Sequence, residues 1–226
     1  MASPRQLALA LDHAASFARE DFLAGPSNEA ALAMIDRWPD WPARALLLVG
    51  PDGAGKSHLA AIWAALSGAR LVAARALEAV SLPGALATGA LVVEDLRSGA
   101  VDERALFHLL NLVREEEASL LITAREMPNA MSFKLADLVS RLAALPVVQI
   151  ATPDDTLLRA VIVKLFADRQ LAVDESLVGY LATRIERSFA GARAAVERLD
   201  AEALRQKRPV TRALAGEVFR EAESAT

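Results

Sequence analysis

A glycine-rich octapeptide between an apolar run and a helical segment constrains this chain more than any other feature. It fits the pattern G-x-x-x-x-G-K-[ST] and consists of Gly50, Pro51, Asp52, Gly53, Ala54, Gly55, Lys56 and Ser57. The apolar run that ends at Val49 predicts a buried strand, and the residues from Lys56 to about Leu66 predict a helix. In that setting, glycines let backbone N–H groups surround phosphate oxygens at a helix N-terminus. We therefore expect the octapeptide to bind the phosphates of a nucleotide, with Lys56 on the β- and γ-phosphates and the Ser57 hydroxyl on Mg²⁺.

Strand-like and helix-like segments alternate over the first two thirds of the chain. Besides the strand before the octapeptide, apolar runs predict four more strands, at residues 69–74, 89–96, 119–124 and 146–151. Helical spacing predicts further helices at residues 27–38 and 102–117. Strands separated by helices are typical of a parallel sheet that is covered on both faces. We therefore predict an α/β fold with a five-stranded parallel sheet.

The sequence changes in character at the end of the fifth predicted strand. Every later segment is helical, and the first has Thr152 as its expected N-cap and Pro153 at its first helical position. We expect three parts: an N-terminal segment at residues 1–16, a nucleotide-binding core at residues 17–151, and a small all-α domain of about four helices at residues 152–226.

The composition excludes several classes of protein. The chain has 226 residues and a net charge of −4, which argues against a dedicated duplex-DNA binder, because such proteins neutralise phosphates with Lys and Arg. The absence of cysteine removes disulfides and thiolate chemistry. No uninterrupted apolar run approaches the ~20 residues that cross a bilayer, and the N-terminus lacks the long apolar stretch of a signal peptide. We therefore expect a cytoplasmic protein that does not contact a membrane.

Polar side chains at the ends of two predicted strands are candidates for chemistry. Glu94 and Asp95 follow four apolar residues and could hold the water shell of a metal ion bound with the nucleotide. Thr123 lies near the end of the next strand, beside the expected position of the γ-phosphate. Arg141 is isolated among apolar neighbours, and two interpretations of it stay open. It is either a charge on a helix surface or an arginine that reaches a phosphate across a subunit interface.

Four segments together resemble an AAA+ domain of the DnaA family: GPDGAGKSH, VVED, LLITAR and DLVSRL. The stretch DFLAGPSNEAA at residues 21–31 resembles the segment near the adenine in that family, which implies nucleotide contacts for Phe22 and Leu23. His58, next after the octapeptide, is both a candidate nucleotide contact and a candidate packing residue. The helical last third resembles the DnaA lid. No helix-turn-helix domain follows it, so we expect no direct sequence-specific DNA binding.

Within the DnaA family the chain is most similar to proteins of the Hda type (HdaA-like), the regulatory inactivators of DnaA. This resemblance implies a protein that binds ADP or ATP and, with the β sliding clamp of DNA polymerase III, promotes hydrolysis of the ATP held by DnaA. Arg141 in SRL matches the arginine finger of the family, which acts in trans. DnaA and the clamp are therefore the implied partners, and a homodimer is also compatible with the sequence.

A short peptide near the N-terminus is the candidate clamp-binding segment. The hexapeptide QLALAL resembles the clamp-binding pattern Q-L-x-L-P-L, with Ala10 in place of proline. An exposed glutamine with spaced leucines suits a preformed apolar pocket. The candidate contacts are Gln6, Leu7, Leu9 and Leu11.

Three departures from the DnaA pattern bear on whether the chain hydrolyses its own nucleotide. Glu94 stands where DnaA usually has Asp, and Arg125 stands where the family often has an acidic sensor of the γ-phosphate. In the lid, Ala190 occupies the expected position of the second sensor arginine, and Arg193, one turn further on, is the candidate replacement. We therefore expect weak or no intrinsic ATPase activity, with the nucleotide held as a conformational ligand between core and lid.

Three other functions fit parts of the pattern. A self-sufficient ATPase of the helicase-loader type is expected to carry a helicase-binding N-terminal extension and a basic face for single-stranded DNA. A small-molecule kinase is expected to have several arginines that converge on the phosphates from a lid inserted in the core. A non-catalytic tether that binds DnaA, with its nucleotide site a relic, fits the same motifs.

Overall fold

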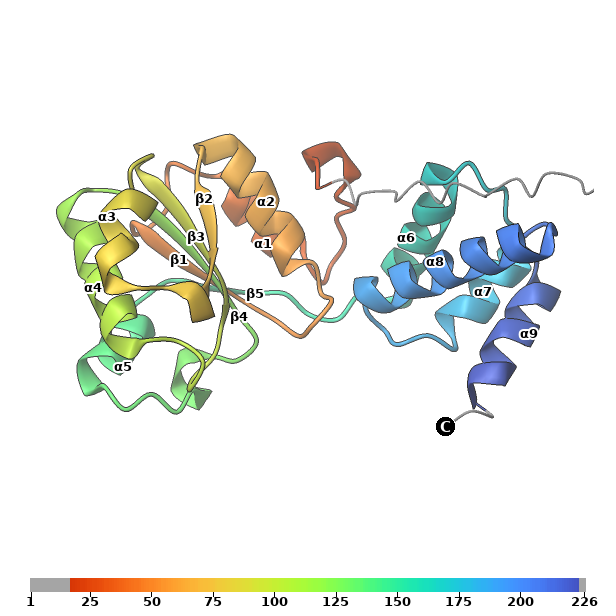
Figure 1. Cartoon of the computed structure of the whole chain (residues 1–226). Coiled ribbons are helices and arrows are strands. Elements are labelled where there is room, and N and C mark those ends of the chain that lie inside the picture. Colours follow the sequence, from red (N-terminus) through yellow and green to blue (C-terminus); the bar gives the residue numbers. More distant parts are fainter. Residues whose placement is uncertain (1–16, 224–226) are drawn as a thin grey trace, which may run out of the picture. The chain divides into compact units, whose positions relative to one another are not determined.

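The computed structural model describes residues 17–223, which divide into two compact units, Phe17–Asp154 and the residues from Asp155 onward. The first unit contains the strands β1 (Ala45–Val49), β2 (Arg70–Ala73), β3 (Ala90–Leu96), β4 (Ser119–Ala124) and β5 (Val147–Gln149). Neighbouring strands are all parallel, in the order β2-β3-β4-β1-β5 (Figure 1). The predicted α/β fold with a five-stranded parallel sheet is confirmed.

Helices cover both faces of this sheet, as the alternation of strands and helices predicts. The helical segments of this unit are η1 (Arg19–Asp21), α1 (Glu29–Asp36), α2 (Lys56–Ser67), η2 (Ala74–Ala76), η3 (Ala79–Ser81), α3 (Leu82–Ala85), α4 (Glu103–Glu115), η4 (Pro128–Ala130) and α5 (Ala136–Ala143). In Figure 1, α1 and α2 lie on one face, and α3, α4 and α5 on the other. Leu46 and Leu48 of β1 accordingly pack with the first set of helices, whereas Leu47 and Val49 pack with the second.

Strand β1 is buried at every position because it lies between β4 and β5 and is covered on both faces. Its last residue, Val49, pairs with Ala124 of β4 and with Gln149 of β5. The three strands therefore end at the same level of the sheet. The chain that leaves β1 enters the octapeptide at this edge.

The second unit contains only helices among its described residues: α6 (Asp155–Asp168), α7 (Glu175–Ala182), α8 (Phe189–Gln206) and α9 (Arg212–Glu223). Leucine, isoleucine, valine, alanine and phenylalanine side chains of all four form one buried cluster. Three side chains cap these helices: Asp174 accepts from the N–H of Leu177, Ser188 from that of Gly191, and Thr211 from that of Leu214. No helix within residues 17–223 is long and apolar enough to cross a membrane.

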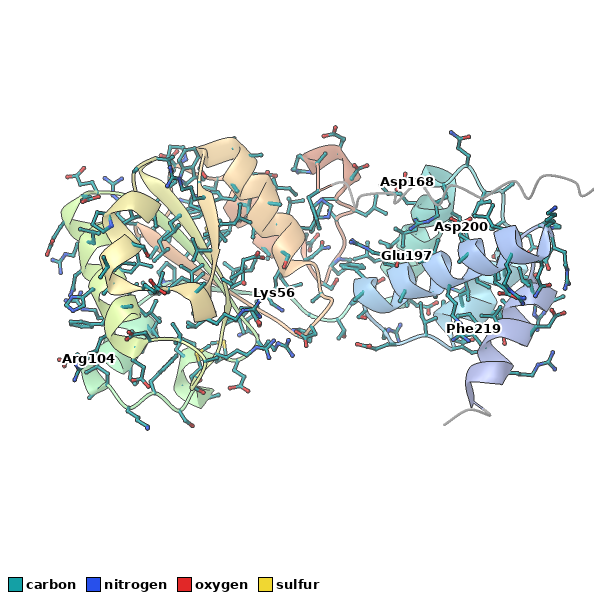
Figure 2. All side chains as sticks on the ribbon, in the orientation of Figure 1. Lys56, Arg104, Asp168, Glu197, Asp200 and Phe219 are labelled. Carbon is teal, nitrogen blue, oxygen red and sulfur yellow. The ribbon has the colours of Figure 1, made fainter. Side chains whose placement is uncertain are left out.

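Charged side chains fasten α8 to its neighbours. Arg169, whose side chain is only 9% exposed, lies 3.5 Å from Glu197 and 3.7 Å from Asp200, the two acids labelled on α8 in Figure 2. Arg198 of α8 donates to the carbonyl oxygen of Val218 in α9 at 2.7 Å.

The predicted start of the first helix after the sheet is wrong by two residues. We expected Thr152 as N-cap and Pro153 as the first helical residue, but α6 begins at Asp155. Residues 151–154 have no regular structure, and the N–H of Ala151 donates to the carbonyl oxygen of Ser27. This hydrogen bond joins the chain after β5 to the loop before α1. Local signals locate a helix end only to within one or two residues, which is the size of the difference.

Asn28 fixes the chain that precedes α1. Its side chain is almost fully buried; the Oδ1 atom accepts from the N–H of Gly25 at 2.9 Å, and the Nδ2 atom donates to the carbonyl oxygen of Leu23 at 3.1 Å. The side chain therefore does not cap α1, of which Asn28 is the N-cap residue. It stabilises the turn at residues 23–28 instead.

Replacing Asn28 by alanine is expected to lower the free energy of unfolding by about 1–3 kcal/mol, because it leaves backbone groups of a tight turn without their partners. Urea denaturation of the two proteins measures the difference. Asn129→Ala, at an exposed site, is the matched control and is expected to change stability by less than about 0.5 kcal/mol. Equal effects of the two substitutions would contradict this account of the turn.

Candidate nucleotide-binding site

The octapeptide follows β1 as a tight loop in which three glycines are required. A Cβ atom at Gly50 would lie 2.5 Å from the carbonyl oxygen of Ile150, so a side chain there collides with backbone. Gly53 and Gly55 have φ angles of +67° and +100°, a region that side chains disfavour. The loop is thus held against the sheet at one end and turned sharply into α2 at the other.

Helix α2 begins at Lys56, and its N-cap residue is Gly55. Glycine has no side chain that could accept from the N–H groups of the first turn, and no side chain caps this helix. These N–H groups and the positive end of the helix dipole therefore favour an anion. Phosphate oxygens are the anions that this combination suits.

Lys56 folds back over the loop (Figure 2). Its Nζ atom donates to the carbonyl oxygen of Gly50 at 2.6 Å and to that of Pro51 at 2.7 Å. Burial lowers the pKa of this ammonium group, and the charge of Asp52 opposes that effect. The lysine is therefore fixed beside the loop, where it can meet a phosphate.

Two acids at the end of β3 differ in their surroundings. The pairing of β3 with β4 shifts between Val93 and Leu96, so both acids lie in an irregularity of the strand. The N–H of Asp95, which has a φ of +59°, donates to Thr123 Oγ1 at 2.9 Å. Glu94 has a buried oxygen, Oε1, that lacks a hydrogen-bond partner. Such an atom fits a metal ion or its water shell.

The residues present fit Mg²⁺ held partly by phosphate. Between residues 17 and 223, no cluster of three or more His, Cys, Asp or Glu side chains could hold a metal alone. Magnesium commonly binds one or two protein oxygens and completes its shell with water and substrate phosphates. Glu94 and the exposed Ser57 are the candidate protein ligands.

Arg125, at the exit of β4, connects the loop to β3. It forms an ion pair with Asp52 of the octapeptide and lies 3.5 Å from Asp95, which also pairs with Arg97 at 2.8 Å. The sequence predicted Asp52 and Asp95 as site residues and singled out Arg125, but the ion pairs of these acids with Arg97 and Arg125 were not predicted. The signal was present, because Arg125 follows β4 directly and parallel strands bring their carboxyl ends to one edge.

Burial alone would raise the pKa of Asp95, but the hydrogen bond and charge of Arg97 and the charge of Arg125 outweigh it. The pKa of Asp95 therefore lies below its usual range. The carboxylate stays ionised at neutral pH and is a weak proton acceptor.

The predicted adenine-side residues meet at the start of α2. The Phe22 ring stands edge-on to His58 with 5.1 Å between ring centroids, and Phe17 does the same at 5.3 Å. His58 Nε2 lies 3.0 Å from the carbonyl oxygen of Ala18. His58 thus packs against the chain before α1, and its contact with a nucleotide stays a prediction. Leu23, the other candidate, contributes its carbonyl oxygen to the turn described above.

Arg141 lies on α5, away from any ion pair. Its side chain is half-buried, and its Cζ atom stands over the Phe107 ring of α4 at 5.3 Å from the centroid. Within the described part of the chain, no carboxylate lies within ion-pair distance of Arg141. No hydrogen bond joins Arg141 to the octapeptide there. The guanidinium therefore lies at the surface on an aromatic ring, neither neutralised nor directed into its own loop.

The other predicted residues are placed as follows. Ala190 is exposed in the first turn of α8, and Arg193 is half-buried at the start of its second turn. Gln6, Leu7, Leu9 and Leu11 lie outside the described residues.

No family model matches the sequence, and no curated protein matches it. Solved structures resemble the fold over most of its length. Domain III of DnaA from Thermotoga maritima has a TM-score of 0.72 at 16% identity, and the match covers 91% of this chain and 96% of that one. AMPPCP-bound DnaA from Aquifex aeolicus has a TM-score of 0.71 at 16% identity, and the match covers 91% of this chain and 69% of that one. The RuvB Holliday junction branch migration motor of Thermotoga maritima has a TM-score of 0.74 at 14% identity, and the match covers 91% of this chain and 72% of that one.

The chain has an AAA+ fold. It is related to that of DnaA, and five parallel strands with the phosphate loop after β1 form its core. At identities of 14–16%, the likeness extends to the fold alone. The Hda type therefore stays a prediction.

In this AAA+ core, Arg97→Gln is expected to raise the pKa of Asp95, because it removes the hydrogen bond and charge that favour the carboxylate. Carboxyl ¹³C shifts in a pH titration measure the pKa of Asp95.

A pKa lowered by folding stabilises the fold above about pH 4, and this contribution is lost as the pH falls through the folded pKa. The stability advantage of the wild type should therefore disappear in acid. Arg104→Gln, on the exposed side of α4 (Figure 2), is the control, and an unchanged Asp95 pKa in Arg97→Gln contradicts the assignment.

Proposed function

We propose that this AAA+ protein binds an adenine nucleotide and promotes hydrolysis of the ATP held by DnaA, through Arg141 acting in trans on a clamp-bound assembly. The observation that carries the proposal is the placement of Arg141. Its guanidinium lies half-buried on Phe107 and is not neutralised by any carboxylate of the described chain. A cation held in this way can meet a phosphate on another molecule.

The nucleotide, ADP or ATP, occupies the loop after β1. Uncapped N–H groups of α2 bind the phosphate oxygens, and Lys56 exchanges the carbonyl oxygens of Gly50 and Pro51 for the β- and γ-phosphates. Glu94 and Ser57 hold Mg²⁺, which neutralises charge on the phosphates when bound. Phe22 and Leu23 lie on the adenine side. The relative described as AMPPCP-bound DnaA carries an adenine nucleotide analogue in the same fold.

The chain's own hydrolysis of ATP is weak in this proposal. A general base works best with a pKa near the working pH, whereas the pKa of Asp95 is lowered by its ion pairs with Arg97 and Arg125. Arg125 also replaces the acidic sensor expected beside Thr123. The bound nucleotide then acts as a conformational ligand, for which Arg193 is the candidate lid contact.

The catalytic contribution is made to the partner's site. An arginine supplied in trans stabilises charge on the transferring phosphoryl group and is worth about 10³–10⁵ in rate, or roughly 4–7 kcal/mol. This magnitude suffices for a regulatory switch of replication initiation. Residues Gln6, Leu7, Leu9 and Leu11 place the protein on the sliding clamp, and hence near DnaA on DNA.

Lys56→Ala is expected to weaken binding of ADP and ATP by about 10- to 100-fold, because a charge-assisted hydrogen bond to phosphate is lost. Titration with a fluorescent adenine nucleotide measures the affinity. Lys134→Ala, at an exposed lysine before α5, is the control and should bind as the wild type does. Wild-type affinity in Lys56→Ala would remove the loop from the proposal, and mass spectrometry of released nucleotide identifies the resident ligand.

Arg141→Ala is expected to keep its affinity for nucleotide and to lose the stimulation of ATP hydrolysis by DnaA. The assay follows phosphate release from ATP-loaded DnaA with clamp-loaded DNA. Arg104→Ala, an exposed arginine on α4, is the matched control and should stimulate normally (Figure 2). Retained stimulation by Arg141→Ala rejects the arginine finger. If stimulation is equally strong without the clamp, the proposed role of the sliding clamp is rejected.

The same assay separates the alternatives. A self-sufficient ATPase of the helicase-loader type turns over ATP without DnaA and binds single-stranded DNA. A non-catalytic tether binds DnaA but leaves its hydrolysis rate unchanged, in the wild type as in Arg141→Ala.

A further inference from the structure

Helix α4 makes two contacts with the segment that carries Arg141, and both come from the same face of the helix. Glu103 and Phe107 are four residues apart, so their side chains lie one above the other along α4. Glu103 contacts the backbone just before α5, and Phe107 contacts Arg141 near the end of α5. The two contacts therefore hold α5 at both ends.

The contact of Glu103 holds the backbone that leads into α5. The N-cap residue of α5 is Leu135, whose side chain cannot accept a hydrogen bond. The Glu103 carboxylate accepts from the N–H of Lys134 at 2.9 Å and from that of Leu135 at 2.7 Å. An anion at this end of α5 also suits the helix dipole. Glu103 thereby fixes where α5 begins, and Leu138 and Leu142, both buried, fix which side of it faces the core.

The contact of Phe107 orders the guanidinium itself. The ring packs against the main hydrophobic cluster of the sheet, so its position is set by the core. The Arg141 guanidinium lies over this ring, 5.3 Å from its centroid. This cation–π contact attracts the guanidinium to the ring, and within residues 17–223 no carboxylate lies within ion-pair distance of its N–H donors.

We propose that Glu103 and Phe107 are positioning residues that hold the Arg141 guanidinium in one orientation before the partner binds. This inference rests on the proposed function for its consequence, but the ordering itself is a property of the chain alone. An arginine with few accessible rotamers loses less conformational entropy when it meets the charge that develops on the partner's phosphoryl group in the transition state, so its ordering changes the maximal rate rather than the binding of the partner. Neither residue touches the partner's reacting atoms in this account.

The first arm of the test measures the ordering without any partner. In the full-length protein, the NMR signal of the Arg141 Nε–Hε group reports its mobility and the ring current of Phe107. Phe107→Leu is expected to remove the ring-current shift and to increase the mobility of the Arg141 side chain. Phe107→Tyr is expected to show the ring-current shift and the low mobility of the wild type. Glu103→Ala is expected to change the amide signals of Lys134 and Leu135 and to increase the mobility of Arg141. An Arg141 signal that Phe107→Leu leaves unchanged overturns the proposal.

The second arm measures stimulation of ATP-loaded DnaA on clamp-loaded DNA. Phe107→Leu is expected to lower the maximal rate about two- to fivefold, without changing the protein concentration at half-maximal stimulation. Phe107→Tyr is expected to restore the rate. Phe133→Leu, a substitution of the same kind in the same hydrophobic cluster, is the control for loss of packing. An equal loss in Phe133→Leu contradicts a specific role for Phe107.

The two arms keep the failures apart. Full stimulation by Arg141→Ala rejects the proposed function, and the NMR signal then still decides whether Glu103 and Phe107 order Arg141. Loss of stimulation in Arg141→Ala, with wild-type rates in Phe107→Leu and Glu103→Ala, rejects the positioning role while the proposed function stands.

Discussion

The parallel pairing of β1 with β4 on one side and β5 on the other is the constraint on which the candidate site depends. This pairing brings the carboxyl ends of three strands to one level, so the loop after β1 starts beside Ala124 and Ile150. Gly50 approaches the Ile150 carbonyl so closely that only glycine fits. The buried sheet therefore positions the start of the phosphate loop, and the contacts of Asp52 and Lys56 add to this.

Opposite charges organise the edge of the sheet around this loop. Asp52 from the loop and Asp95 from β3 share Arg125 from β4, and Arg97 adds a second positive charge beside Asp95. Glu94, one residue earlier, keeps an unpartnered buried oxygen instead. Adjacent acids on one strand thus have different chemistry, because the irregularity in β3 turns them towards different neighbours. One carboxylate is neutralised by arginines, and the other has a buried oxygen without a hydrogen-bond partner.

The parts of the fold that depend on local pattern could be predicted from the sequence, whereas contacts between distant segments could not. Continuous apolar runs located the strands to within two residues, and the spacing of Gly50, Gly55 and Lys56 located the loop. The pairing of Asp52 with Arg125 joins residues 73 positions apart, and the hydrogen bonds from the N–H groups of Lys134 and Leu135 to Glu103 span about 30. Only tertiary packing brings such groups together. The start of α6 at Asp155 differs by two residues from the signals of Thr152 and Pro153, because such signals locate a helix end only to within one or two residues.

The hydrogen bonds of Lys56 to its own loop have a consequence for how tightly any anion can be held. Two of the three N–H donors of the ammonium group are already bonded to carbonyl oxygens, so a ligand that displaces them gains only the difference between the new contacts and the old pair. The carbonyl oxygens that it leaves must then be hydrated or find other donors. This exchange therefore makes the loop bind an anion less tightly than a loop whose lysine has no internal partners.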